Sequence, residues 1–161
     1  MLAILIALAA VQAQPAPACP ATPASLPAEL AGWRSGRAIA AAADPGDAAV
    51  LTLGQGARAA LHPSTRVAFP VKPAKPGPGM HGGLLAFDVA RAGRYRVALE
   101  TPGWLEVVRE ARAVASVAHA HGPACSGIRK MVDFDLRPGR HLLEIAGAPN
   151  ASAIVLVARL R

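Results

Sequence analysis

The segment from His119 to Lys130 brings together side chains that could hold a metal ion. His119 and His121 are separated by one residue, so on a strand both imidazoles project from the same face. Two imidazoles at this spacing suit zinc, copper or iron, and His81 or His141 would supply a third ligand if the fold brought it near. The alternative is that these histidines border a loop and face solvent, in which case no cofactor is expected.

The same segment contains a serine and ends in two basic residues. Ser126 invites a hydrolase interpretation, but the Gly-x-Ser-x-Gly pattern is missing and no oriented base can be inferred. We therefore interpret Ser126 as a turn residue and predict no catalytic residue. Arg129 and Lys130 could bind a carboxylate or a phosphate, or they could keep the start of a strand soluble.

Trp104 is an aromatic residue that could bind a ligand. Together with Arg129 and Lys130 it forms the predicted set of binding residues. With Tyr95 it could stack on a sugar, although both rings also suit the core or its edge. Asp133 and Asp135 alternate on one strand face and could work as a pair, and the simpler expectation is that they face solvent as partners of Arg129 or Arg137.

The composition describes a small basic domain with few aromatic residues. The 161 residues include 17 Lys and Arg against 10 Asp and Glu, for a net charge of +7, and only 4% are aromatic. The arginines are scattered singly and there is no run of basic residues, whereas nucleic-acid sites need clustered cations and stacking rings. We therefore expect no nucleic-acid partner. An anionic partner such as an acidic polysaccharide is one explanation of the charge, and codon bias is the other.

The first thirteen residues are apolar and predict a signal peptide. Val11 and Ala13 suit a signal-peptidase site, with Gln14 as the first mature residue, although no Lys or Arg precedes the apolar run. The run is too short to span a bilayer. A buried N-terminal helix is the alternative. We expect a periplasmic or secreted protein that does not span the membrane.

Export would decide whether Cys19 and Cys125, the only two cysteines, are oxidised. In an oxidising compartment an even count predicts a disulfide bond between them. The closed loop of roughly a hundred residues would be worth about 4 to 5 kcal/mol in the chain-entropy model. Metal ligation by a reduced Cys125 is the competing role.

Three regions are predicted along the chain. Residues 1–13 form the signal peptide, residues 14–36 a proline-rich arm with a short helical turn at 29–33, and residues 37–161 a single domain. Within that domain, apolar and polar residues alternate in short runs separated by Gly and Pro turns, which is typical of half-buried antiparallel strands. The fold class predicted is an all-β, antiparallel, jelly-roll-like β-sandwich. The expected strands are 49–53, 66–71, 84–89, 94–100, 104–109, 112–118, 131–136, 141–146 and 153–160.

Two family resemblances rest on short stretches of this pattern. The turn Ala92-Gly93-Arg94-Tyr95, the run 104–108 and the returning segment 136–141 resemble bacterial pre-peptidase C-terminal domains and related carbohydrate-binding sandwiches, which implies an ancillary, non-catalytic module. The string Cys125-Ser-Gly-Ile-Arg-Lys130 and the following strand are similar to small exported bacterial proteins often labelled homogentisate 1,2-dioxygenase. That label implies an iron site of two histidines and a carboxylate.

The function expected from these observations is an exported, non-catalytic β-sandwich that binds a ligand or has a structural role. The partner would be an envelope polysaccharide or another exported protein. One alternative is a metal-dependent enzyme or metal-binding protein centred on His119 and His121, including the dioxygenase of the label. The other is a polyanion or cell-envelope adhesion module.

Overall fold

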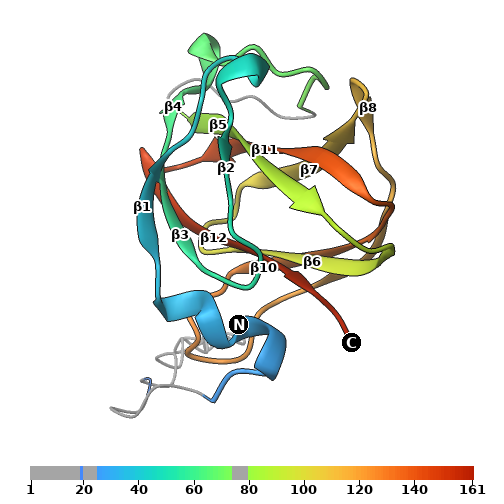
Figure 1. Ribbon diagram of the computed structural model, residues 1–161. Helices are drawn as coiled ribbons and strands as arrows, with labels where there is room; N and C mark the ends of the chain where they lie inside the picture. The colour runs from blue at the N-terminus through green and yellow to red at the C-terminus, as the bar shows by residue number, and fades with distance from the viewer. Residues whose placement is uncertain (1–18, 20–24, 74–79) are drawn as a thin grey trace, which may run out of the picture.

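The computed structural model describes Cys19, residues 25–73 and residues 80–161 (Figure 1). The predicted signal peptide lies outside these residues, as do residues 14–18 and 20–24 of the proline-rich arm. Two six-stranded sheets pack face to face, so the predicted all-β sandwich is confirmed. No helix in the described part of the chain is long and apolar enough to cross a membrane.

Each sheet combines strands from distant parts of the sequence. Sheet A has the spatial order β1 (Arg37–Ala40), β3 (Ala57–Ala60), β12 (Ser152–Arg159), β6 (Gly93–Leu99), β10 (Lys130–Leu136) and β9 (Ser116–Ala120). Sheet B has the order β2 (Ala49–Val50), β5 (His81–Val89), β11 (Gly139–Ala148), β7 (Trp104–Arg109) and β8 (Arg112–Ala113), and β4 (His62–Pro63) also pairs with β5. All strand pairs are antiparallel except β1–β3 and β2–β5.

The main core lies between the two sheets and follows from the alternation of the strands. On β10 the alternating residues Val132, Phe134 and Leu136 are all buried in it. They meet Phe87 of β5 and Leu143 of β11 across the sandwich. The period of two therefore sets which face of each strand enters the core.

A second layer covers the outer face of sheet A. The 3-10 helix η1 (Ala28–Arg34) includes the predicted helical turn at 29–33, and Leu30 and Trp33 pack against Met131 and Leu156. Trp33 is 2% exposed, so its ring is buried in this second layer. Gly56 lets the chain pass close beneath η1, because a Cβ there would lie 2.5 Å from the Trp33 carbonyl oxygen.

The outer face of sheet B is covered by residues 64–73, where the predicted strand at 66–71 is wrong. The segment begins with η3 (Ser64–Arg66) and continues without regular structure, and Val67 and Phe69 pack on Leu84 and Ala86. Its apolar residues cover the face of a sheet instead of joining an edge. Of the expected strand at 49–53 only residues 49–50 form a strand, β2, and the short 3-10 helix η2 (Pro45–Asp47) precedes it.

A candidate anion-binding pocket beside the disulfide loop

The loop between β9 and β10 is fixed from two sides. The predicted disulfide bond between Cys19 and Cys125 is confirmed, with Cα atoms 5.5 Å apart. On the other side, the Trp33 indole Nε1–H donates to the Ser126 carbonyl oxygen at 3.1 Å. The Ile128 N–H donates to Ser126 Oγ at 3.1 Å, which gives the buried serine the turn role expected for it. The loop is therefore a rigid support for the residues at its two ends.

Those two ends border an open pocket of about 340 Å³. Within the described residues its lining contains no acidic side chain, while it includes both histidines and both cations that the sequence singled out. The lining residues are Pro102, His119, Ala120, His121, Arg129 and Lys130. Four of the predicted site residues thus come together because β9 and β10 pair antiparallel, with His119 and Lys130 on the two strands and His121 and Arg129 directly next to them.

Hydrogen bonds hold the two imidazoles in place. The His121 Nδ1–H donates to the Arg129 carbonyl oxygen at 3.0 Å, and Nε2 has no hydrogen-bond partner among the residues that the structure describes. His119 Nε2 lies 2.9 Å from Ser116 Oγ, and either atom is the donor, depending on the tautomer. The backbone of Arg129 is fixed in turn, because its N–H donates to the Leu99 carbonyl oxygen at 2.9 Å.

Lys130 joins the pocket to Trp104. Its ammonium donates to the Gly103 carbonyl oxygen at 3.2 Å and lies 5.3 Å from the centre of the Trp104 ring, a cation–π distance. Trp104 is 40% exposed on the outer face of sheet B. The third predicted binding residue therefore lies next to the other two, without lining the pocket itself.

Glu106 is a charged neighbour of this group that the sequence did not single out. Burial lowers the pKa of Lys130, and the nearby Glu106 carboxylate opposes that effect. Burial also raises the pKa of Glu106, opposed by a hydrogen bond from Trp104 and by the charge of Lys130. Lys130 and Glu106 thus partly compensate each other, and the net positive charge of the pocket rests mainly on Arg129.

The third metal ligand proposed from the sequence does not accompany His119 and His121. His81 lies on β5 of the other sheet, opposite Ala148, and outside the pocket lining. His141 is buried on β11, stacked on Phe87, with its Nδ1–H donated to the Gly139 carbonyl oxygen. Across the described residues, no three His, Cys, Asp or Glu side chains form a group suited to a metal ion.

The expected partners of the two aspartates on β10 are wrong. Antiparallel pairing with β6 places Asp133 opposite Arg96 and Asp135 opposite Arg94. Asp133 accepts two hydrogen bonds from Arg96, at 2.8 and 2.9 Å, and is buried beneath η1 instead of facing solvent. The sequence could not show this because it does not give the strand register.

Tyr95 belongs to the core and not to a sugar platform. It is 1% exposed, and its O–H donates to the Arg91 carbonyl oxygen at 2.8 Å. Glu144 was also missed, although its position between Leu143 and Ile145 marks a polar residue in an apolar strand. It lies directly opposite Glu106 in the register of β11 and β7.

No model of a known protein family matches the chain, and no curated protein matches it. Both resemblances stated from the sequence stay predictions. The function has to be argued from the geometry of the pocket and its neighbours.

Proposed function

We propose that this protein is an exported, non-catalytic binding module whose pocket between β9 and β10 holds an acidic saccharide of the cell envelope. The observation that carries the proposal is the convergence of His119, His121, Arg129 and Lys130 on one open pocket whose described lining contains no carboxylate.

The chemistry of the lining suits a carboxylate. Arg129 offers a guanidinium fork that matches a carboxylate with two parallel hydrogen bonds. Lys130 uses one of its three N–H groups on Gly103 and keeps the others for a ligand. His121 has a ring nitrogen free of hydrogen bonds within the described structure. A uronic acid would supply the carboxylate together with hydroxyl groups for the imidazoles.

The half-exposed Trp104 ring supports a saccharide over a simple anion. An aromatic face beside charged donors binds the apolar face of a sugar ring while the donors bind its polar groups. The non-catalytic assignment is supported by the same lining, since glycoside hydrolysis ordinarily uses two carboxyl groups across the scissile bond. In the described pocket, neither a carboxyl group nor a thiol faces the ligand space.

The test is binding of alginate, a polymer of uronic acids, compared with a neutral glucan of similar size. We expect the purified protein to bind alginate and not the neutral glucan. The affinity for alginate should fall steeply as the salt concentration rises. The double variant Arg129→Ala/Lys130→Ala should lose about tenfold or more in affinity, since each charge-assisted contact is strong. Trp104→Ala should weaken alginate binding and leave the salt dependence unchanged.

A matched control distinguishes the effect of the pocket residues on binding from the effect of the protein's net charge. Arg112→Ala/Arg137→Ala removes two exposed cations that are not part of the pocket lining. This variant should bind alginate like the wild type. An equal loss in both double variants would contradict the proposal, because the overall charge of the protein would then explain the binding.

A further inference from the structure

The edges of the two sheets differ in how they are protected against further strand pairing. Natural sheets protect an edge with very short strands, bulges or charged side chains. In sheet B, β2, β4 and β8 have only two residues each. In sheet A, the pairing of β9 with β10 contains an irregularity between Asp133 and Phe134. These edges are therefore poor templates for another strand.

The remaining edge, β1, has four residues with one charged side chain, Arg37, and no bulge interrupts its pairing. Its parallel register with β3 is regular over four residue pairs. Ala41 donates its N–H to the Ala60 carbonyl oxygen at 3.0 Å, so residues of the same parity direct their backbone groups toward β3. The N–H and C=O groups of Ala38 and Ala40 consequently face away from β3, and the open stretch ends at Ala42, which pairs with Leu84 of β5. Methyl side chains leave Ala38 and Ala40 sterically open.

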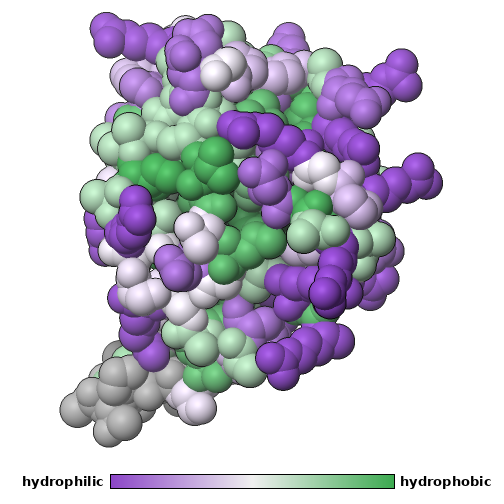
Figure 2. Space-filling model, viewed as in Figure 1, coloured by the Kyte–Doolittle hydropathy of each residue, from purple (hydrophilic) through white to green (hydrophobic). Residues whose placement is uncertain are grey.

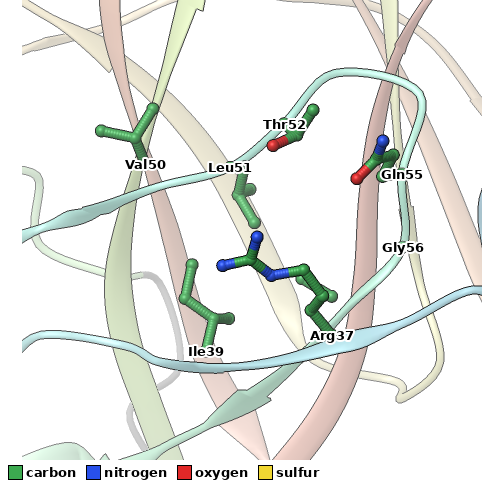
Figure 3. Close-up of a pocket in the computed structure, with 8 residues that line it drawn as sticks. Arg37, Ile39, Val50, Leu51, Thr52, Gln55 and Gly56 are labelled. Atoms are coloured by element: carbon green, nitrogen blue, oxygen red, sulfur yellow. The ribbon is translucent and has the colours of Figure 1, made fainter.

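A small pocket lies beside this edge, between β1 and the segment that follows β2. Figure 3 shows the Arg37 guanidinium between the side chains of Ile39 and Leu51, with Val50 on the same wall. Arg37 forms no ion pair within the described part of the chain. The pocket is only about 40 Å³, enough for a carboxylate group. Its remaining lining includes Thr52 and Gln55, which add polar groups.

Hydrophobic surface surrounds this cation. Figure 2 shows apolar residues gathered in the middle of the face on which β1 and β2 lie. Val50 is 48% exposed there, and Ile39 is half-buried. An open strand edge, an apolar strip and an uncompensated cation are the three elements that recognise an extended peptide with alternating side chains.

We propose that β1 is a docking edge for an extended segment of another protein. The segment adds a strand to sheet A by pairing with Ala38 and Ala40. It places an acidic side chain against Arg37 and, two residues away, an apolar side chain against Ile39 and Val50. This site is separate from the saccharide pocket, because β1 and β9 lie at opposite edges of sheet A.

Charge argues for a foreign segment over a second copy of this chain. Each copy carries Arg37 on β1, so two copies joined through β1 would bring two arginines without a described ion pair to one shared edge. Like charges across paired strands are destabilising. A foreign segment with a carboxylate would instead be attracted to Arg37, because the two groups carry opposite charges.

The probe is the capped peptide Asp-Thr-Val-Thr-Val-Thr, compared with the same peptide carrying Lys in place of Asp. We expect the acidic peptide to shift the amide resonances of Ala38 and Ala40 in the labelled protein and to slow their hydrogen exchange. The lysine peptide should bind about tenfold more weakly or not at all, as expected when one charge-assisted contact is lost. Arg37→Glu should reverse this preference, with Arg112→Glu as the matched control.

Ala40→Pro tests the backbone pairing. It removes an N–H that points away from β3, so the fold keeps its own hydrogen bonds while the edge loses a donor. Peptide binding should be lost. If the variant fails to fold, the proposal is tested by the amide shifts of the wild-type protein and by the reversed peptide preference of Arg37→Glu. Unchanged Ala38 and Ala40 amides, shifts confined to β9, or a dimer that Ala40→Pro dissociates would each overturn the proposal.

Discussion

At the scale of single residues, Glu144 is the most unusual group in the molecule. It is 1% exposed, and its Oε1 accepts the Val71 N–H at 2.9 Å. Its Oε2 is buried without a hydrogen-bond partner in the described structure. Burial raises the pKa of Glu144 to about 7, helped by the charge of Glu106 and opposed by the Val71 hydrogen bond. The carboxyl is therefore largely protonated in mildly acidic solution.

This shift predicts that stability falls as the pH rises. The pKa of Glu144 is higher in the folded state than its ordinary 4.5, so its stabilising effect is complete below pH 4.5 and is lost as the pH rises through 7. The change is worth at most about 3 kcal/mol. Glu144→Gln does not titrate, so urea unfolding should show a smaller loss of stability between pH 5 and pH 8. The exposed control Glu110→Gln should behave like the wild type, and an identical pH profile for Glu144→Gln would refute the prediction.

The two Arg–Asp pairs between β6 and β10 predict different costs of removal. Asp133 is buried against Arg96, whose other partner is Glu29 at 3.5 Å. Asp133→Ala leaves a partly buried guanidinium undercompensated and should cost roughly 2 kcal/mol. Asp135→Ala breaks a pair in which both side chains are at least half exposed and should leave stability almost unchanged. Chemical unfolding of the two variants compares them directly, and equal losses would contradict the assignment.

At the scale of elements, η1 and the disulfide loop act as one unit on the outer face of sheet A. Trp33 fills the space between them and donates a hydrogen bond to Ser126. Gly127 has φ 79° and Cys125 has φ 59°, so the loop keeps a tight left-handed path next to the indole. The orientation of the pocket residues Arg129 and Lys130 depends on this packing, because β10 starts where the loop ends.

Trp33→Ala should therefore destabilise the fold by roughly 3 to 4 kcal/mol, the usual cost of removing a buried large ring. It should also speed hydrogen exchange at the amide of Ile128, which donates to Ser126. Trp104→Ala makes the same change at a half-exposed ring and should cost much less. Chemical unfolding and exchange measured on both variants test this, and a larger effect of Trp104→Ala would argue against the packing role of η1.

The sequence predicted those elements whose hydrophobic contrast was strong. Residues 83–160 alternate large apolar and polar side chains, and most of their strands lie where expected. The strand β3 was missed because Ala-Arg-Ala-Ala has little contrast between its faces, although Ala59 is buried. The pocket residues were found because they lie within one short segment. The Glu106–Glu144 pair could not be found because only strand register brings those residues together.

At the scale of the whole molecule, the Cys19–Cys125 bond closes a loop with a sequence separation of 106. The chain-entropy model values such a loop at about 4 to 5 kcal/mol. Cys19→Ser/Cys125→Ser should lose up to this amount in urea unfolding, and wild type with reductant should match the variant. Thiol titration of the unfolded, unreduced protein should find no free thiol. A reductant effect that persists in the double variant would show that the loss has another cause.

The position of β12 within sheet A governs how the molecule can assemble. Residues 152–159 form the strand between β3 and β6, although they follow both in the sequence by a long distance. Until that segment inserts, sheet A consists of two separate ribbons, β1–β3 and β6–β10–β9. Folding must therefore wait for a pairing between distant parts of the chain, which is intrinsically slow. During that delay, unpaired strands of the two ribbons stay open to aggregation.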